Sequence, residues 1–227
     1  MAERDSAAVE AMFDRIALRY DLNNSLLSAA SDRRWRRATA RAARVGPSAR
    51  LLDVACGSGK LAGALRRRGP DGLVVGLDFS ANMLRVASRK QPNVSYLRGD
   101  GLKLPFADGV FDAVTVGFGL RNYADPLLGL REMRRVLKPA GRALVLEFVR
   151  PPDGPIGALY RRYLRHILIP VGGWISGEPQ AYRYLTDTVD SYRTPEQLAE
   201  LGRQAGWREV ELKLLTFGTV GLLSGTA

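Results

Sequence analysis

The feature that most constrains how this chain can fold is a regular alternation, between residues 46 and 150, of short apolar runs with amphipathic stretches. The runs have the length of strands, and the stretches between them carry apolar residues at helical spacing. Strands that alternate with helices of about ten residues form βαβ units, which build a parallel sheet covered on both faces. We therefore predict strands at residues 50–54, 73–77, 94–97, 111–116 and 142–148, with helices at residues 59–68, 80–90 and 126–137 and Ser80 as the N-cap of the second helix.

Helical patterns flank this alternating region at both ends. Apolar side chains recur at helical spacing on both sides of a turn near residues 21–24, and Gly46-Pro47 ends the second of these helices. Prolines within residues 151–155 break the alternation, and a mainly helical segment follows. The chain is then predicted to close with a helix at residues 197–205 and strands at 209–215 and 219–223.

Two residue counts exclude several kinds of site. The 227 residues contain one cysteine, Cys56, and one histidine, His166. A single thiol rules out a disulfide framework and a multi-thiolate zinc site, and a single imidazole makes a histidine-based metal site untenable. No apolar stretch approaches the roughly 20 residues that span a bilayer, and the N-terminus lacks the apolar core of a secretory signal. We therefore expect a cytoplasmic protein without a metal.

The net charge of +11 points first to an anionic partner, either a nucleic acid or a membrane surface. Only five of the 34 basic residues are lysines, however, and the arginines are spread along the chain. This preference for arginine over lysine is more typical of a genome's overall base composition than of a surface that binds phosphates. Charge therefore does not select a partner by itself.

A glycine-rich turn carries the clearest ligand signal. The first strand leads through Gly57-Ser58-Gly59 into a helix, where glycines let a ligand approach the backbone and free N–H groups face it. Asp78 follows about 20 residues later, at the end of the second strand, where a carboxylate can bind a ribose diol. The same spacing satisfies the looser dinucleotide fingerprint, and a βα turn without a ligand is a further alternative.

Two further acidic residues select among these ligands. Asp53 lies inside the first strand, four residues before Gly57, where its carboxylate would repel a pyrophosphate but attract an ammonium group. Asp100-Gly101 follows the third strand and is placed to hold an adenine amino group. A ligand with an amine, a ribose and an adenine, but no phosphate, is S-adenosylmethionine.

These motifs resemble the successive cofactor motifs of class I methyltransferases. Longer runs are similar to the ubiquinone/menaquinone biosynthesis C-methyltransferase family, and the resemblance covers essentially the whole chain. The runs Phe118-Gly119-Leu120-Arg121-Asn122 and Tyr20-Asp21 are the most particular to that family. Other similar runs lie at residues 104–106, 135–139, 146–148 and 182–185.

The resemblance implies a Rossmann-like α/β fold with a seven-stranded, mostly parallel sheet whose last strand is antiparallel. It implies one methyltransferase domain over residues 1–227. This domain comprises an N-terminal helical segment (1–45), a cofactor-binding βαβ core (46–150), a helical substrate lid (151–190) and a closing helix and strands (191–227). The implied cofactor residues are Asp53, Gly57, Ser58, Gly59, Asp78, Asp100, Gly101 and Gly117, the last of which stands where relatives often carry a serine.

The implied reaction is S-adenosylmethionine-dependent C-methylation of a reduced prenylated quinone, with demethylmenaquinol as the expected acceptor. Loss of a phenolic proton makes the neighbouring ring carbon nucleophilic, so the site needs an oxyanion partner and a base. Arg121 is the expected oxyanion partner, and its permanently charged guanidinium cannot be the base. His166 is the candidate base because histidine titrates near neutral pH, and Asn122 and Tyr184 complete the catalytic candidates.

Each of these candidates also has a structural interpretation. Arg121 could be an ion-pair partner of Asp125, His166 a residue at the surface or a helix end, and Tyr184 a packing residue. Glu147, after an apolar run, is more typical of a strand-end carboxylate than of a base.

Other functions stay open at this point. Carbon or oxygen methylation of another phenolic or quinoid molecule is the first alternative. A nucleic-acid methyltransferase is opposed by the lack of a polar-Pro-Pro-aromatic turn after the fourth strand, and an NAD-dependent oxidoreductase by Asp53 and Asp100. A non-catalytic subunit of a quinone-synthesis complex is the last.

The expected acceptor also suggests where the protein works. A polyprenyl quinone resides in the bilayer, and residues 159–175 mix arginines with aromatic and aliphatic side chains. Such a segment can rest on an anionic surface, so we expect transient contact with the inner face of the cell membrane. A homodimer is also compatible with the sequence.

Overall fold

The computed structural model describes residues 31–69, 71–151, 154–163, 166, 170 and 192–227. The expected helices before residue 31, and most of the helical segment between residues 164 and 191, lie outside the described residues. Among the described residues, no helix has the length and hydrophobicity needed to span a bilayer.

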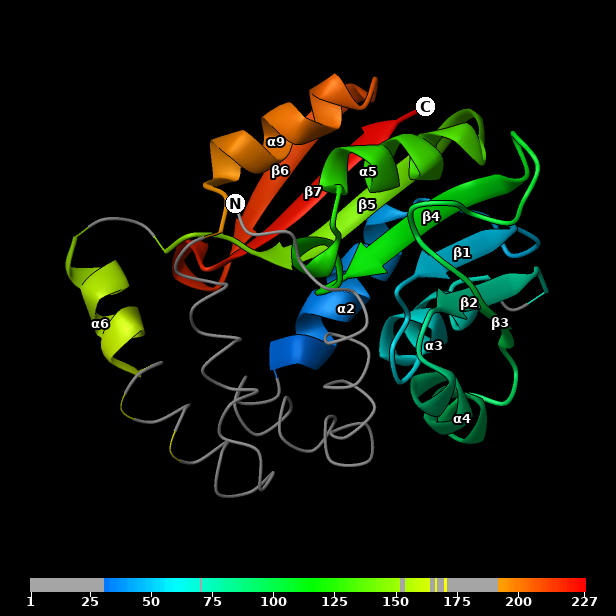
Figure 1. The fold of residues 1–227 in the computed structure, drawn as a ribbon, viewed down its shortest axis with the longest axis horizontal. Coiled ribbons are helices and arrows are strands. Elements are labelled where there is room, and N and C mark those ends of the chain that lie inside the picture. Colours follow the sequence, from blue (N-terminus) through cyan, green and yellow to red (C-terminus); the bar gives the residue numbers. More distant parts are fainter. Residues whose placement is uncertain (1–30, 70, 152–153, 164–165, 167–169, 171–191) are drawn as a thin grey trace.

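A seven-stranded sheet forms the centre of the molecule, in the order β3-β2-β1-β4-β5-β7-β6 (Figure 1). Strands β1 to β5 run parallel, and β7 is antiparallel to both of its neighbours, as the sequence predicted. The strands are β1 (Leu51–Val54), β2 (Val74–Asp78), β3 (Ser95–Arg98), β4 (Phe111–Gly117), β5 (Leu137–Phe148), β6 (Arg208–Leu215) and β7 (Val220–Thr226).

Helices cover the two faces of this sheet. In Figure 1, α2, α3 and α4 lie on one face, and α5 and α9 lie on the other. These helices are α2 (Ser31–Ala42), α3 (Lys60–Arg66), α4 (Ala81–Lys90), α5 (Pro126–Arg135) and α9 (Pro195–Gln204). A further helix, α6 (Pro155–Tyr163), and two 3₁₀ turns, η1 (Leu120–Asn122) and η3 (Thr216–Gly218), complete the described elements.

The helix starts follow from capping side chains in the sequence. Ser80 Oγ accepts the Met83 N–H at 3.1 Å, which confirms the predicted N-cap of α4. Asp125 caps α5 in the same way, accepting the Leu128 N–H at 3.0 Å. A side chain that accepts such a donor stabilises a helix by about 1 kcal/mol.

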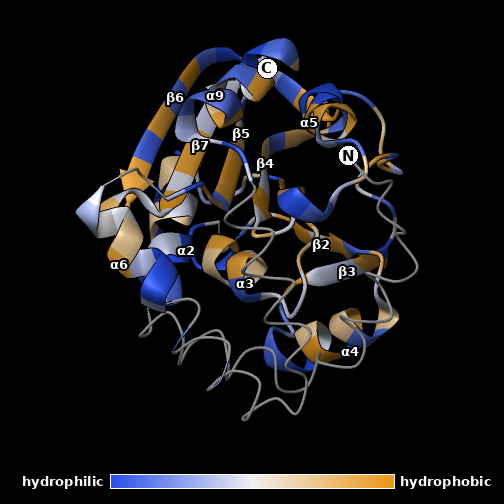
Figure 2. Ribbon diagram, turned by 60° about the vertical axis from the view of Figure 1, so that its left-hand side comes forward, coloured by the Kyte–Doolittle hydropathy of each residue, from blue (hydrophilic) through white to orange (hydrophobic). Residues whose placement is uncertain are grey.

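The core lies where the sheet is buried on both faces. Every residue of β1 and β2 is buried, which explains their continuous apolar runs, and Figure 2 shows hydrophobic residues along the central strands. The strand order reverses between β1 and β4, because β1 leads to β2 on one side while β4 lies on the other. A ligand crevice is expected at the carboxyl ends of the strands at such a switch point.

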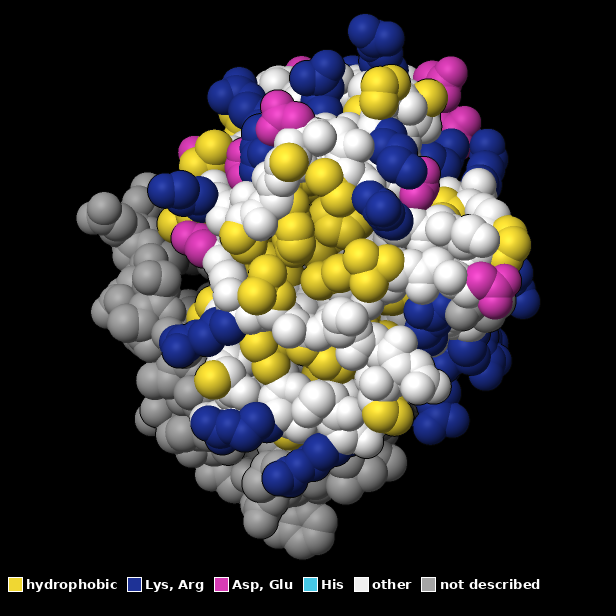
Figure 3. Space-filling model, turned by 90° about the vertical axis from the view of Figure 1, so that its right-hand side faces the viewer, with side chains coloured by type: hydrophobic (Ala, Val, Ile, Leu, Met, Phe, Trp, Pro, Cys, Tyr) yellow, Lys and Arg dark blue, Asp and Glu magenta, His cyan; other side chains and the backbone are white. Residues whose placement is uncertain are grey.

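The edge beside β3 differs from the rest of the sheet. Residues 99–110 join β3 to β4 without a helix, and Leu73, just before β2, is 45% exposed. Figure 3 looks onto this side of the molecule and shows apolar side chains in the centre with basic ones spread around them. The basic residues of this face therefore do not form a single patch of the kind a nucleic-acid backbone would need.

Candidate functional site

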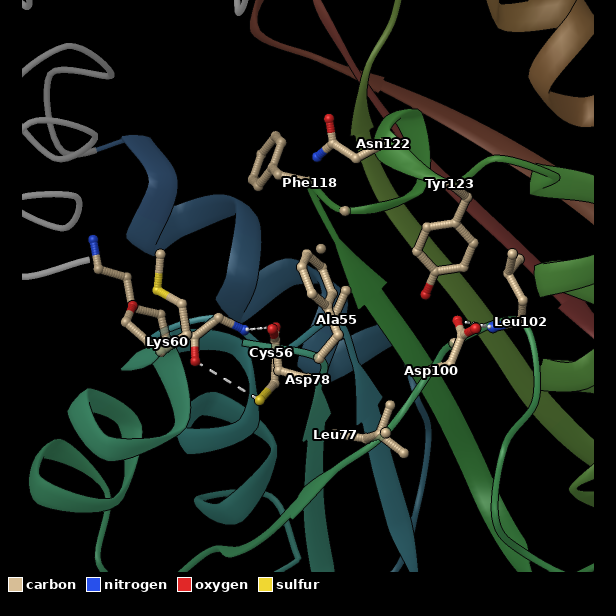
Figure 4. Close-up of a pocket in the computed structure, with 18 of the residues that line it drawn as sticks. Ala55, Cys56, Lys60, Leu77, Asp78, Asp100, Leu102, Phe118, Asn122 and Tyr123 are labelled. Atoms are coloured by element: carbon tan, nitrogen blue, oxygen red, sulfur yellow. Dashed lines mark hydrogen bonds between the residues drawn. The ribbon is translucent and has the colours of Figure 1, made fainter. Parts of the chain in front are cut away.

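A cavity of about 320 Å³ opens at the carboxyl ends of β1, β2 and β4. Its wall combines the glycine loop after β1, the end of β2, the turn after β3, the segment after β4, and Arg36 from α2 (Figure 4). The cavity therefore lies at the switch point of the sheet, where the fold places ligands. The residues from the sequence prediction that line it are Gly57, Ser58, Asp78, Asp100, Gly101, Gly117 and Asn122.

The glycine loop has a backbone conformation that residues with a side chain rarely adopt. Gly57 and Gly59 have φ angles of +53° and +79°. A Cβ atom at Gly59 would lie 2.6 Å from the Tyr96 hydroxyl, so both the backbone angle and the space require glycine. Ala55 and Phe118 also have positive φ angles, +51° and +60°, although they are not glycines. Such strain gathers at binding sites, and it marks the ends of β1 and β4 here.

Asp78 ties the end of β2 to this loop. Its carboxylate accepts the Gly57 N–H at 2.8 Å and the Ser80 N–H at 3.0 Å. An ionised carboxylate has about four acceptor positions, so an oxygen that accepts an N–H can accept a ligand hydroxyl as well. The Asp78 side chain is thus held in the cavity wall by two backbone N–H groups.

Asp100 and Tyr123 form the opposite wall. Asp100 accepts the Leu102 N–H at 2.8 Å, and the Tyr123 hydroxyl points into the cavity towards Asp100 (Figure 4). The tyrosine ring lies against Gly101, where a Cβ would be 2.3 Å from the hydroxyl oxygen. Burial, together with the carboxylates of Asp78 and Asp100, raises the pKa of Tyr123. The hydroxyl is therefore a neutral donor, and in the described part of the chain it has no hydrogen-bond partner.

Asp53 lies behind the glycine loop and is not part of the cavity wall. It is 1% exposed, and the Thr115 hydroxyl donates to its Oδ1 at 2.7 Å. Its Oδ2 is buried and has no hydrogen-bond partner among the described residues. Burial raises the pKa of Asp53 to about 7, against the bonding from Thr115 and the attraction of Arg36, which lower it.

Arg121 points away from the cavity into a buried ion pair. Its Nη1 lies 2.7 Å from Glu147 Oε1 and also donates to the Phe118 carbonyl at 2.7 Å. The Arg121 N–H donates to the other oxygen of Glu147 at 3.1 Å. The structural interpretation of Arg121 therefore holds, but its expected partner was wrong, because Asp125 caps α5 instead.

The remaining catalytic candidates are not brought together. Asn122 lies in the wall of the cofactor cavity, whereas His166 is exposed and lines a second cavity of about 580 Å³ between α6 and η3. Tyr184 lies outside the described residues. His166 and Asn122 thus face different cavities, and this geometry gives no support to His166 as a base for chemistry beside Asn122.

Several wall residues were missed from the sequence. Arg36 and Tyr123 lie on elements outside the glycine and acidic motifs, and Lys60 begins α3 directly after the loop. Lys60 could have been found, because it follows Gly59 at the helix start. No comparable signal marked Arg36, which lies among other arginines of α2.

Comparison with known proteins decides the family. The chain matches the model of the ubiE/COQ5 methyltransferase family over residues 1–227. The chain belongs to this family. Demethylmenaquinone methyltransferase from Thermus thermophilus is 47% identical over 94% of this chain and 99% of its own length, and the protein of that name from Beutenbergia cavernae is 45% identical over 97% and 91%.

A solved structure shares the fold at lower identity. The S-adenosylmethionine-dependent methyltransferase from Thermotoga maritima, described as a possible histamine N-methyltransferase, superimposes with a TM-score of 0.64 at 20% identity, covering 95% of this chain and 98% of its own. This confirms the Rossmann-like methyltransferase fold. Because it belongs to the ubiE/COQ5 methyltransferase family, this chain is an enzyme that transfers a methyl group from S-adenosylmethionine.

Proposed function

We propose that this enzyme methylates a ring carbon of a reduced prenylated quinone, with demethylmenaquinol as the acceptor. The proposal is carried by a cofactor cavity of the methyltransferase type in a chain 45–47% identical to two relatives named for this reaction. The runner-up acceptor is another phenolic or quinoid molecule, which the same geometry would admit.

The cavity residues fit S-adenosylmethionine part by part. The rigid carboxylate of Asp78 suits the ribose diol, and Asp100 with Gly101 suits the adenine. Gly57 and Ser58 bring the backbone close to the ligand and Gly59 is the N-cap of α3, while Asp53 behind the loop supplies negative charge for a cationic cofactor. When bound, the cofactor supplies an electrophilic methyl group.

We assign contact with the quinol acceptor to the turn after β4. A quinol that had lost a phenolic proton to solvent would carry negative charge on the oxygen and on the neighbouring ring carbon. That carbon would accept the methyl group of the bound cofactor and release its own proton to solvent. Asn122 is the proposed donor to the phenolate oxygen, and its position in the cavity wall after β4 supports this role. Arg121 acts as a positioning residue. Its guanidinium binds both Glu147 of β5 and the Phe118 carbonyl, and so fixes the turn against β5.

The test is a methyl-transfer assay with isotopically labelled S-adenosylmethionine. A demethylmenaquinol analogue, a demethoxybenzoquinol and total RNA are offered in parallel. Label transferred to a ring carbon of the naphthoquinol, and not to RNA, is the expected result. Label on a phenolic oxygen, or only on another phenol, would select the runner-up acceptor.

Replacing Asp78 with alanine is expected to weaken binding of S-adenosylmethionine about 100-fold, because charge-assisted bonds to the ribose diol are lost. The variant also loses the acceptor of the Gly57 N–H, which loosens the loop. Calorimetric titration measures the effect, and Asp71→Ala, which removes an exposed acid outside the cavity, is the control. Unchanged affinity in Asp78→Ala would remove Asp78 from the cofactor site.

Contact with an anionic membrane is also part of this proposal. Leu159 of α6 and Phe217 of η3 are 70% and 81% exposed, and with Arg162 they line the second cavity. Exposed apolar side chains beside a cation suit an anionic lipid surface, and the cavity between them suits an apolar tail.

The variant Phe217→Ser is expected to reduce co-flotation with vesicles of anionic lipid at low salt by severalfold, since it removes the most exposed apolar group of this surface. Leu73→Ser, which changes an exposed apolar residue beside β2, should float like the unmodified protein. Equal flotation of all three proteins would contradict the assignment of this surface, and no flotation of any would contradict membrane contact.

A further inference from the structure

Two of the residues in the cavity wall are cations, Arg36 and Lys60, and they differ in how they are paired. Lys60 Nζ lies 3.1 Å from Oδ2 of Asp32, a buried carboxylate at the start of α2. Arg36 forms no ion pair with any residue that the structure describes, and its Nε is buried without a hydrogen-bond partner there. Of the two, Arg36 is the cation with capacity for an anionic ligand.

The guanidinium of Arg36 is held in a defined place. Its Cζ lies 5.3 Å from the ring centre of Phe118, which is itself part of the cavity wall. The neighbouring Trp35 is buried, packs against Phe118 at 5.9 Å between ring centres, and donates through Nε1 to Thr216 Oγ1 at 2.8 Å. α2 is thus fixed beside the end of β4, and little entropy is lost when Arg36 binds a ligand.

Gly117 provides the space that this arrangement needs. A Cβ at Gly117 would lie 3.4 Å from Arg36 Nη1 and 3.0 Å from Leu61 Cδ2. Any side chain at this position would therefore press on Leu61 and narrow the space for the guanidinium. The glycine at the end of β4 keeps Arg36 at the cavity.

The position of Arg36 identifies the part of the ligand that it faces. The acids that suit ribose and adenine, Asp78 and Asp100, follow β2 and β3. Arg36 lies at the side of β4 and α2, against the ring of Phe118. The α-carboxylate of the methionine part is the one anionic group of S-adenosylmethionine, so it is the group that a cation of the cavity wall would bind. We propose that Arg36 binds the α-carboxylate of the methionine part of S-adenosylmethionine.

This inference rests on the cofactor and not on the identity of the acceptor, so binding without acceptor tests it. The probes are S-adenosylmethionine, decarboxylated S-adenosylmethionine, which keeps the sulfonium and the amine, and 5′-methylthioadenosine, which lacks the whole amino-acid part. The unmodified protein is expected to bind the full cofactor about 30-fold more tightly than the decarboxylated one, as for a charge-assisted, forked contact.

The variant Arg36→Met should abolish most of that difference while leaving the affinity for 5′-methylthioadenosine unchanged. Arg37→Met, which removes an exposed cation from the same helix, should behave like the unmodified protein. Arg36→Lys should restore part of the difference, since an ammonium keeps the charge but not the fork.

Equal weakening of the full and the decarboxylated cofactor in Arg36→Met would overturn the proposal, as would unchanged affinity for both. Retained binding of 5′-methylthioadenosine shows that the variant is folded around its adenosine site. If Arg36→Met no longer binds 5′-methylthioadenosine, Arg36→Lys is compared with the unmodified protein instead. An equal loss of affinity for the full and the decarboxylated cofactor in Arg36→Lys would contradict the assignment. Failure to methylate a quinol would not affect any of these outcomes.

Discussion

Replacing Arg121 with methionine is expected to lower the free energy of unfolding by about 3 kcal/mol, because it leaves the carboxylate of Glu147 buried without its cation. Arg121 and Glu147 are both almost fully buried, with 2.7 Å between Nη1 and Oε1. Breaking a buried pair costs about 3–5 kcal/mol, and the lower end applies here since the backbone N–H groups of Arg121 and Phe148 still donate to Glu147.

Chemical denaturation of the unmodified protein and the variant measures this effect. Two controls distinguish the loss of a buried ion pair from the loss of an exposed one. The double variant Arg121→Met/Glu147→Met should recover most of the stability, because it removes both buried charges. Asp108→Asn, which breaks an ion pair of Arg135 with an acid 80% exposed, should cost less than about 1 kcal/mol.

The same variants separate the two roles considered for Arg121. A positioning role predicts that turnover in the double variant falls because the turn carrying Asn122 is no longer held, while cofactor affinity stays near normal. An unchanged unfolding free energy in Arg121→Met would contradict the buried pair. Full turnover in the double variant would contradict any part for Arg121 in the reaction.

The alternation of apolar runs was sufficient to predict the parallel part of the sheet, whereas the antiparallel last strand was implied only by the resemblance to the family. Strand β1 was predicted within one residue, and Ser80 was identified as an N-cap from its type and position alone. The prediction was less accurate for β5, which begins at Leu137 rather than 142. Leu137 already pairs with Phe111, and the register shifts before Arg142 pairs with Ala113, so the strand continues through a polar stretch with no apolar pattern.

The partner of Arg121 could not be predicted because it depends on register between strands. The Phe118 N–H donates to the Leu146 carbonyl at 2.7 Å, which extends the pairing of β4 with β5 past the end of β4. That extension brings Arg121 beside Glu147, 26 residues away. A signal was present: Glu147 is an acid in an apolar strand, as Asp53 is in β1, and a buried acid requires either a partner or a raised pKa.

The variant Asp53→Asn is expected to stabilise the cofactor-free protein by about 2–4 kcal/mol at pH 8 and to leave it nearly unchanged at pH 4. Burial raises the pKa of Asp53 to about 7, well above the ordinary value of 3.8. The folded state therefore prefers the protonated acid. As pH rises from about 4 to 7 the unfolded chain ionises first, so this residue lowers stability progressively, and the full penalty persists above pH 7. Asparagine is neutral throughout and can still accept from Thr115.

Binding of the cationic cofactor should show the opposite sign, because it favours the ionised form of Asp53. As the pH is raised towards 7, affinity for S-adenosylmethionine is expected to increase by up to about tenfold per pH unit, and to level off above pH 7. The affinity of Asp53→Asn should be lower at pH 8 and independent of pH. Glu132→Gln is the matched control: the hydrogen bond from Arg135 lowers the pKa of Glu132, so its stabilisation is present at neutral pH and lost in acid. Coincident unfolding curves of Asp53→Asn and the unmodified protein at pH 8 would show that Asp53 is ionised without cost. A cofactor affinity independent of pH in the unmodified protein would show that Asp53 does not sense the ligand.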